Sequence, residues 1–206
     1  MIELFKHLFD LDFEWIVNHY SDSIYIVLFL VIFIETGLVI MPFLPGDSLL
    51  FSVGLLAAAS GELSLGTVIP LLIGAALLGD QVNYFIGKYF SNIIREREQV
   101  LFLKRKHIEE TEAFYAKYGP KTVILARFIP IVRTVAPFVA GAGRMSYPVY
   151  LLYGFLGATL WVSSISAAGY FLGDNEFVKA NFEKVVLGIV GVSVLPILWG
   201  LISKRK

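Results

Sequence analysis

The chain has 206 residues, of which 57% are hydrophobic, and its mean hydropathy of +0.73 indicates an integral membrane protein. Its 17 basic and 17 acidic residues balance, so no overall field favours nucleic acid as a partner. Because the chain has no cysteine, disulfides, thiolate metal sites and a cysteine nucleophile are excluded.

The apolar stretches set the expected order of helices. Residues 1–22 carry several acids among apolar positions, which predicts an amphipathic helix at the membrane interface. A helix that crosses the hydrocarbon needs about 20 mostly apolar residues. Four stretches approach that length, namely 24–41, 65–90, 149–173 and 184–202. Two others, 49–59 and 121–143, are too short or too broken by proline to cross as straight helices.

The two broken stretches predict re-entrant segments. We expect a first broken hairpin over 24–59 and a second over 121–148, with helix breaks marked by Pro45, Gly46, Pro130 and Pro137. Irregular backbone at membrane depth persists only where protein or a water-filled cavity surrounds it. Both segments should therefore face the protein interior.

Positive charge predicts the sidedness of the chain. The polar stretch 91–120 reads as an amphipathic helix with alternating charge, and eight Lys or Arg lie from Lys88 to Lys121. The chain ends in Lys204, Arg205 and Lys206. The positive-inside rule places both regions, and thus the C-terminus, in the cytoplasm. The N-terminal side stays open.

Short matches between the two halves suggest an internal repeat. PFLPG at 42–46 is echoed by PFVAG at 137–141, LLIG at 71 by LLYG at 151, and YFIG at 84 by YFLG at 170. An inverted repeat of this kind places a substrate site near the bilayer midplane, between broken helices. The sequence thus predicts one all-α, polytopic membrane domain over residues 1–206.

Five ionisable residues lie within apolar sequence: Glu35, Asp47, Asp80, Arg127 and Arg133. Each costs roughly 2.5–3.5 kcal/mol at the centre of the bilayer, so pairing, hydration or a surface position is required. Asp47 has the form of a helix N-cap, and Asp80 of a structural hydrogen-bonding residue. Glu35 has no basic neighbour in sequence, so a structural role explains it less well.

Arg127 and Arg133 flank Pro130, where helix opening frees backbone amides beside two permanent positive charges. This pattern favours an anion site, and phosphate fits because arginine binds it bidentately. Two structural alternatives stay open: the arginines snorkel to an interface, or they only neutralise Glu35 and Asp47. Carboxylates in a low-dielectric site can exchange protons near neutral pH. The combination predicts proton-linked handling of an anionic lipid.

Two further features have simpler interpretations. Trp161 and Trp199 are more typical of membrane-interface anchors than of site residues. Gly154 and Gly157 have the spacing of helix-packing positions.

The stretches ETGLVIMPFLPGDSLLFSVG (35–54) and FYAKYGPKTVILARFIPIVRTVAPFVAGAGRMSYPVY (114–150) resemble the DedA family, bacterial relatives of eukaryotic VTT-domain lipid scramblases. With GDQVNYFIG, the resemblance covers nearly the whole chain and is strongest to the member that gave the family its name. It implies two re-entrant hairpins facing each other. It also implies transport of undecaprenyl phosphate across the bacterial cytoplasmic membrane, dependent on the proton motive force.

The resemblance also assigns roles. The family's important acids fall on Glu35 and Asp47, which we expect to couple protons, and its two essential arginines on Arg127 and Arg133, which we expect to bind the lipid phosphate. Asp80 and Asn83 match only a subset of the family and are carried over as supporting residues.

Other functions stay open at this stage. A proton-coupled antiporter of small cations or drugs would use the carboxylates for its substrate, and an energy-independent phospholipid scramblase would need no proton coupling. A lipid phosphatase is disfavoured because His7, His19 and His107 all lie outside the apolar segments. We therefore expect no catalytic residues, cofactor, metal or nucleic acid. The expected partners are a polyprenyl phosphate or phospholipid, protons and membrane lipid, and a homo-oligomer stays open.

Overall fold

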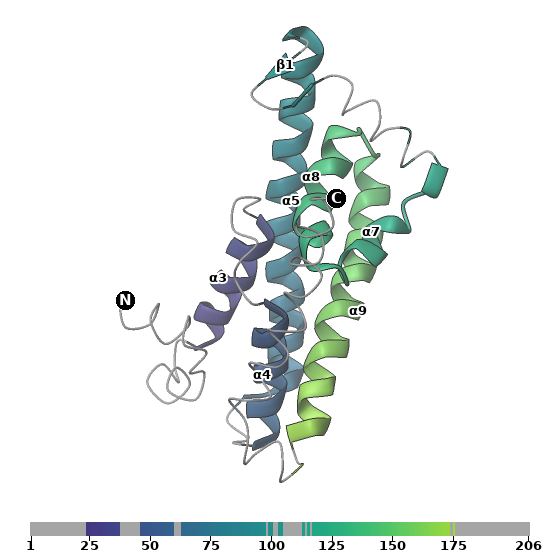
Figure 1. The fold of residues 1–206 in the computed structure, drawn as a ribbon. Helices are drawn as coiled ribbons and strands as arrows, with labels where there is room; N and C mark the ends of the chain where they lie inside the picture. The colour runs from purple at the N-terminus through teal and green to yellow at the C-terminus, as the bar shows by residue number, and fades with distance from the viewer. Residues whose placement is uncertain are drawn as a thin grey trace, which may run out of the picture. The chain divides into compact units, whose positions relative to one another are not determined.

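The computed structural model describes residues 24–37, 46–59, 63–97, 99–100, 103–104, 113, 115, 117–173 and 175. Figure 1 shows its helices: α3 (Ile24–Gly37), α4 (Gly46–Ala59), α5 (Leu65–Arg97), α7 (Thr122–Ala126), α8 (Pro130–Ala142) and α9 (Tyr147–Gly173). Two short strands, β1 (Gln99–Val100) and β2 (Leu103–Lys104), complete the described elements. The predominantly helical fold agrees with the all-α prediction.

Two of these helices are long and apolar enough to cross a membrane. Their apolar parts run from Leu65 to Ser91 in α5 and from Tyr147 to Leu172 in α9. Both match predicted spans, although α5 continues into the polar stretch as far as Arg97. The predicted helices at 1–22 and 184–202 lie outside the described residues, as does Pro45.

The polar stretch is not helical throughout, which corrects the expected amphipathic helix over 91–120. β1 and β2 pair antiparallel, with Gln99 opposite Lys104 and Val100 opposite Leu103. The sequence between Val100 and Leu103 is a continuous apolar run. Such a short run is compatible with a strand as well as with a helix segment, and here the backbone pairs as two strands.

The second broken segment has one break. α7 ends at Ala126, and Ile129 takes extended angles (φ −117°, ψ 109°) directly before Pro130, the first residue of α8. Proline disfavours helical angles at the preceding residue and is well tolerated at the first helical position. The expected second break at Pro137 is wrong, because α8 continues through it. α7 and α8 pack against each other, while a re-entrant path through the membrane stays a prediction.

The chain forms two compact units. Unit 1 contains Met1–Val31, Pro45–Leu72 and Val162–Lys206, and unit 2 contains Ile32–Leu44 and Ile73–Trp161. α3, α5 and α9 each contribute residues to both units. Glu35, Asp80 and both arginines belong to unit 2, whereas Asp47 belongs to unit 1.

Unit 1 is built on a close contact between α4 and the second half of α9. A Cβ on Gly54 would collide with the carbonyl oxygen of Ser166, and one on Gly169 would collide with that of Phe51. Backbones can approach this closely only where side chains are absent. These glycines therefore hold the broken segment's helix against a long apolar helix.

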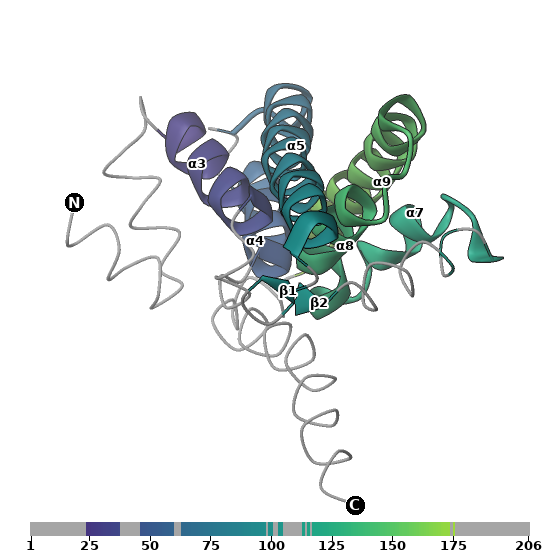
Figure 2. The same ribbon diagram turned by 90° about the horizontal axis from the view of Figure 1, so that it is seen from above.

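Unit 2 contains a pair of the same construction, in which α8 lies alongside α5 (Figures 1 and 2). A Cβ on Gly141 would collide with the Tyr84 carbonyl oxygen, and one on Gly87 with that of Phe138. In each unit a Phe-x-x-Gly step of the short helix meets a glycine of the long helix. The inverted repeat stays a prediction, but these contacts relate α4 to α8 through FSVG at 51–54 and FVAG at 138–141 rather than through PFLPG and PFVAG.

Candidate functional site

Unit 2 buries two ion pairs between four different segments. Arg127 donates from Nη2 to Oδ2 of Asp80, and Arg133 donates from Nη2 to Oε1 of Glu35 at 2.5 Å. The side chains expose at most 6% of their surface. Removing one partner of such a buried pair is strongly destabilising, typically by about 3–5 kcal/mol, because the remaining charge is uncompensated.

The break between α7 and α8 places the two arginines. Arg127 is the C-cap of α7, and Arg133 lies one turn into α8, where its backbone N–H donates to Ile129 at 2.9 Å. The non-helical residues between the two helices let both side chains reach acids on different helices. Arg127 meets Asp80 on α5, and Arg133 meets Glu35 near the end of α3.

Arg127 keeps donor capacity beyond its carboxylate partner. Among the described residues, its Nε and Nη1 atoms have no hydrogen-bond acceptor, although both are buried. A guanidinium group offers five N–H donors in a planar fork. Arg127 can therefore donate further hydrogen bonds to oxygen atoms of an anionic ligand while staying beside Asp80.

One face of α9 shapes the space around both arginines. A Cβ on Gly157 would lie 3.0 Å from Cδ and 3.1 Å from Nε of Arg127. Trp161, one turn later, covers the Arg133 guanidinium, whose carbon lies 4.6 Å from the ring centroid. Trp161 is buried, so its interpretation as an interface anchor is wrong. Nothing in the sequence distinguished this Gly–Trp pair from helix packing.

Asn83 links the two helices that carry the second ion pair, α3 and α8. Its Nδ2 donates to the carbonyl oxygen of Thr36 at 3.3 Å and to that of Thr134 at 2.7 Å. Thr36 and Thr134 directly follow Glu35 and Arg133 in sequence. Asn83 thus acts as a positioning residue for this ion pair.

Asp80 has a larger role in the geometry than its supporting assignment suggested. Its carboxylate balances Arg127, and its backbone carbonyl accepts a hydrogen bond from the Tyr150 hydroxyl at 3.2 Å. The separation of 47 positions between Asp80 and Arg127 hides this pairing from any local pattern.

The remaining predicted residues have different positions. Asp47 lies half-buried in the first turn of α4, where a helix dipole favours an acid, rather than at the N-cap. Gly46 is the first residue of α4, and Pro137 is buried inside α8. Because Asp47 belongs to unit 1, a shared site with the arginines stays a prediction.

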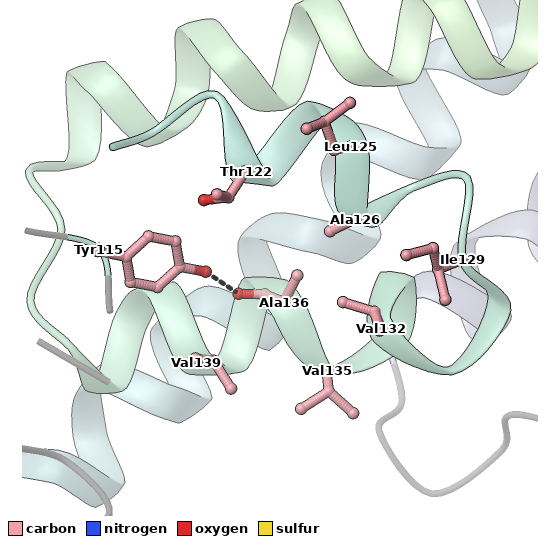
Figure 3. A pocket seen from close by; sticks show the side chains of 9 residues that line it. All are labelled: Tyr115, Thr122, Leu125, Ala126, Ile129, Val132, Val135, Ala136 and Val139. Atoms are coloured by element: carbon pink, nitrogen blue, oxygen red, sulfur yellow. Dashed lines mark hydrogen bonds between the residues drawn. The ribbon is translucent and has the colours of Figure 1, made fainter. Parts of the chain in front are cut away.

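An apolar cavity of about 520 Å³ lies between α7 and α8 (Figure 3). It is lined mainly by aliphatic side chains from both helices and the residues between them, including Leu125, Ile129, Val132 and Val135. Tyr115 lies at one side, where its hydroxyl donates to the Ala136 carbonyl oxygen at 3.2 Å. Burial raises the pKa of Tyr115 to about 12. Ala126 and Val132 precede the two arginines in sequence, so the cavity and the ion pairs share one short segment.

Comparison with known proteins finds relatives that all belong to membrane-protein families or carry membrane-protein names. The VTT domain family matches residues 44–171. The chain is 44% identical over 207 residues to Protein DedA of Escherichia coli K12, covering 100% of this chain and 94% of that protein. It is 45% identical over 168 residues to an uncharacterized membrane protein of Mycobacterium leprae, covering 82% and 75%.

A third relative is the inner membrane protein YqjA of Escherichia coli K12, 30% identical over 202 residues, with 98% of this chain and 91% of that protein covered. No solved structure matches the chain. The full-length match to Protein DedA and the domain match agree with the resemblance seen in the sequence. The chain is therefore a membrane protein that belongs to the VTT-domain family and, within it, to the DedA proteins.

Proposed function

We propose that this protein transports a polyprenyl phosphate, undecaprenyl phosphate in bacteria, across the cytoplasmic membrane together with protons, driven by the proton gradient. The observation that carries the proposal is the pairing of two buried arginines with two carboxylates. Arginine binds phosphate through parallel N–H donors and stays charged at any physiological pH. The phosphate would replace the carboxylates as the acceptor of these donors.

Charge balance supplies the coupling. The two arginines and two carboxylates sum to zero, so a phosphate can bind without excess negative charge only when carboxylates take up protons. Protonating Glu35 and Asp80 without a ligand leaves two guanidinium charges, each costing roughly 2.5–3.5 kcal/mol at the bilayer centre. A phosphate dianion restores neutrality. Protons and phosphate thus bind together, and an inward proton gradient returns the lipid to the cytoplasmic leaflet.

The apolar cavity between α7 and α8 supports a lipid substrate over a free anion. Its walls come from the same short segment as the arginines, and its lining is almost wholly aliphatic. The first isoprene units of a polyprenyl phosphate suit this lining, since apolar surface is favoured in apolar surroundings.

The geometry argues against the cation antiporter. Asp80 and Glu35 each already balance a guanidinium charge. The two ion pairs therefore have no net negative charge that would attract a cation. Energy-independent scrambling differs from the proposed transport in that it needs no protons. The charge balance above requires one proton for every negative charge of the phosphate. Asp47, with its predicted proton-coupling role, would add a further acid from α4.

The test is recycling of the lipid carrier in cells that depend on this protein. Arg127→Ala and Arg133→Ala should each abolish recycling per molecule of inserted protein, and recycling is normalised to the amount in the membrane because each variant also leaves an unpaired buried carboxylate. An exposed substitution on α5, Thr67→Ala, serves as the matched control. Normal recycling in either arginine variant would contradict the proposed mechanism.

A further inference from the structure

A second cavity, of about 360 Å³, lies in unit 2 where α5 meets the turn between α8 and α9. We name it the Lys88–Arg144 cavity. It is lined by Tyr84, Lys88, Arg144, Met145, Ser146 and Tyr147. None of these lining residues belongs to the buried ion pairs, so the cavity is a separate feature of the molecule.

Its position matches the boundary between hydrocarbon and water. Lys88 lies near the end of the apolar part of α5, and Tyr147 begins that of α9. Phe85, Tyr84 and Tyr147 cluster there, with the Tyr147 ring 5.4 Å from Phe85 and 5.7 Å from Tyr84. Aromatic side chains with adjacent Lys or Arg are typical of membrane interfaces. Lipid headgroups occupy this level.

The chemistry of the lining favours an anion. Its six residues include two cations and no carboxylate. Ser146 adds a hydroxyl group and precedes the first residue of α9, whose N-terminal end carries partial positive charge. Because Lys88 comes from α5 and Arg144 from the α8–α9 turn, the fold brings the two charges together from separate segments.

Arg144 is held in an unusual backbone conformation. Its φ of 52° is left-handed, and it is the one described non-glycine residue with positive φ. Its N–H donates to Gly141, and the N–H of Met145 donates to Ala140, which together form a Schellman cap of α8. Glycine is the usual residue at this position, so an arginine there is strained. An outlier of this kind points to a role for the side chain.

The cavity and the Asp80–Arg127 ion pair lie along one face of α5. Asp80, Tyr84 and Lys88 are spaced four residues apart, so they share that face over about 12 Å. Tyr150 extends the connection, because its ring stacks on Tyr84 at 4.5 Å and its hydroxyl donates to the Asp80 carbonyl. A ligand at the cavity would thus lie two helical turns from the buried charges.

We propose that the Lys88–Arg144 cavity binds the phosphate headgroup of a lipid at the membrane surface, in the position from which it exchanges with the buried arginines. The exchange step rests on the proposed transport function, whereas headgroup binding does not. Two lipids share the necessary chemistry: a polyprenyl phosphate, which is a phosphomonoester, and phosphatidylglycerol, which is a phosphodiester.

The experiment maps where a phosphate lipid contacts the full chain. The protein is placed in phosphatidylcholine nanodiscs with a polyprenyl phosphate or phosphatidylglycerol that carries a photoreactive group beside the phosphate. Peptides labelled on illumination are identified by mass spectrometry. In the wild-type protein we expect labels at residues 144–147 and at residues 127–133.

Lys88→Gln with Arg144→Gln should remove most labelling at 144–147. Arg127→Ala should lower labelling at 127–133 and leave the surface label in place. Arg144→Gly removes the side chain and relaxes the cap, so labelling should fall while the thermal unfolding temperature stays the same or rises. This variant separates loss of binding from loss of folding.

The two probes distinguish the lipids that could occupy the cavity. A stronger label from the monoester identifies the transported carrier as the occupant, and an equal or stronger one from phosphatidylglycerol identifies a resident phospholipid.

The inference is overturned if a neutral phosphatidylcholine probe labels 144–147 as strongly as the anionic probes. It is equally overturned if the double variant keeps full surface labelling. Surface labelling without any label at 127–133 would retain the headgroup site and count against the transport function, so the two failures are distinguishable.

Discussion

Arg133 and Glu35, which are 98 residues apart in sequence, meet in a buried hydrogen bond of 2.5 Å. Glu35 lies near the end of α3 and Arg133 in the second turn of α8. The contact therefore ties the first broken segment to the second through one charge pair. Its burial makes each charge dependent on the other.

This dependence predicts a thermodynamic cycle. Glu35→Ala and Arg133→Met should each lower the free energy of unfolding by about 3–5 kcal/mol, because each leaves an unpaired buried charge. The double variant should recover much of that loss. Thermal or denaturant unfolding of purified protein measures the cycle. Additive losses would show that the two side chains do not interact.

Asp80 should matter as much to transport as Glu35, although the family resemblance implies only a supporting role for it. Asp80→Asn keeps the size of the side chain but removes the charge that balances Arg127. Carrier recycling should fall severalfold, with Gln81→Ala, at the next position on α5, as the control. Recycling at the wild-type rate in Asp80→Asn would exclude Asp80 from the coupling step.

A substitution at Gly157 tests the position of the Arg127 side chain without any change of charge. Gly157→Ala adds a Cβ 3.0 Å from Cδ of Arg127, which must shift. Gly154→Ala makes the same substitution on the same helix with no heavy atom within 4 Å. Transport should fall in the first variant and not in the second, while both gain helix propensity. Equal transport in the two variants would contradict the placement of Arg127.

Trp161 should contribute through its ring face. Trp161→Leu removes the cation–π contact with Arg133, worth about 2 kcal/mol or more at a desolvated site, and also leaves a smaller side chain. Trp161→Phe keeps an aromatic face and should lose less stability. The comparison is made by thermal unfolding, with Leu160→Ala as the exposed control. Equal losses for Leu and Phe would assign the effect to packing alone.

The raised pKa of Tyr115 predicts that the stability of the protein falls at alkaline pH. Burial raises its pKa from the ordinary value of 10.0 to about 12, so the folded protein holds this proton more tightly than the unfolded chain. The contribution to stability is fully present below pH 10 and is lost as pH rises from 10 to about 12. Tyr115→Phe should remove this part of the pH dependence. Identical alkaline unfolding profiles of the two proteins would refute the assignment.

The site residues that could be predicted were those whose chemistry is improbable in apolar sequence. Glu35, Arg127 and Arg133 stand out because charge is costly there, and Pro130 marks the break between them. The break at Pro137 could not be excluded, since helix continuity depends on packing by α5 around it. Thr134, three residues before Pro137, shows a contact of this kind, because its carbonyl oxygen accepts a hydrogen bond from Asn83 on that neighbouring helix.

The pairing of charges could not be predicted. The sequence groups Glu35 with Asp47 and sets Asp80 apart, whereas the structure joins Asp80 to Arg127. Which acid reaches which arginine depends on helix packing over tens of residues, and no local period encodes it. The burial of Trp161 could not be predicted for a related reason, because the sequence of an apolar helix is the same whether its tryptophan faces lipid or a guanidinium group.

The most direct test of the central claim is reconstitution of the purified protein in vesicles with a labelled polyprenyl phosphate. Surface exposure of the phosphate is followed with and without a pH gradient. The account predicts that lipid accumulates in the leaflet on the alkaline side, and that accumulation stops when the gradient is collapsed or Arg133 is replaced by alanine. Equal exposure in both leaflets regardless of the gradient would contradict proton-coupled transport.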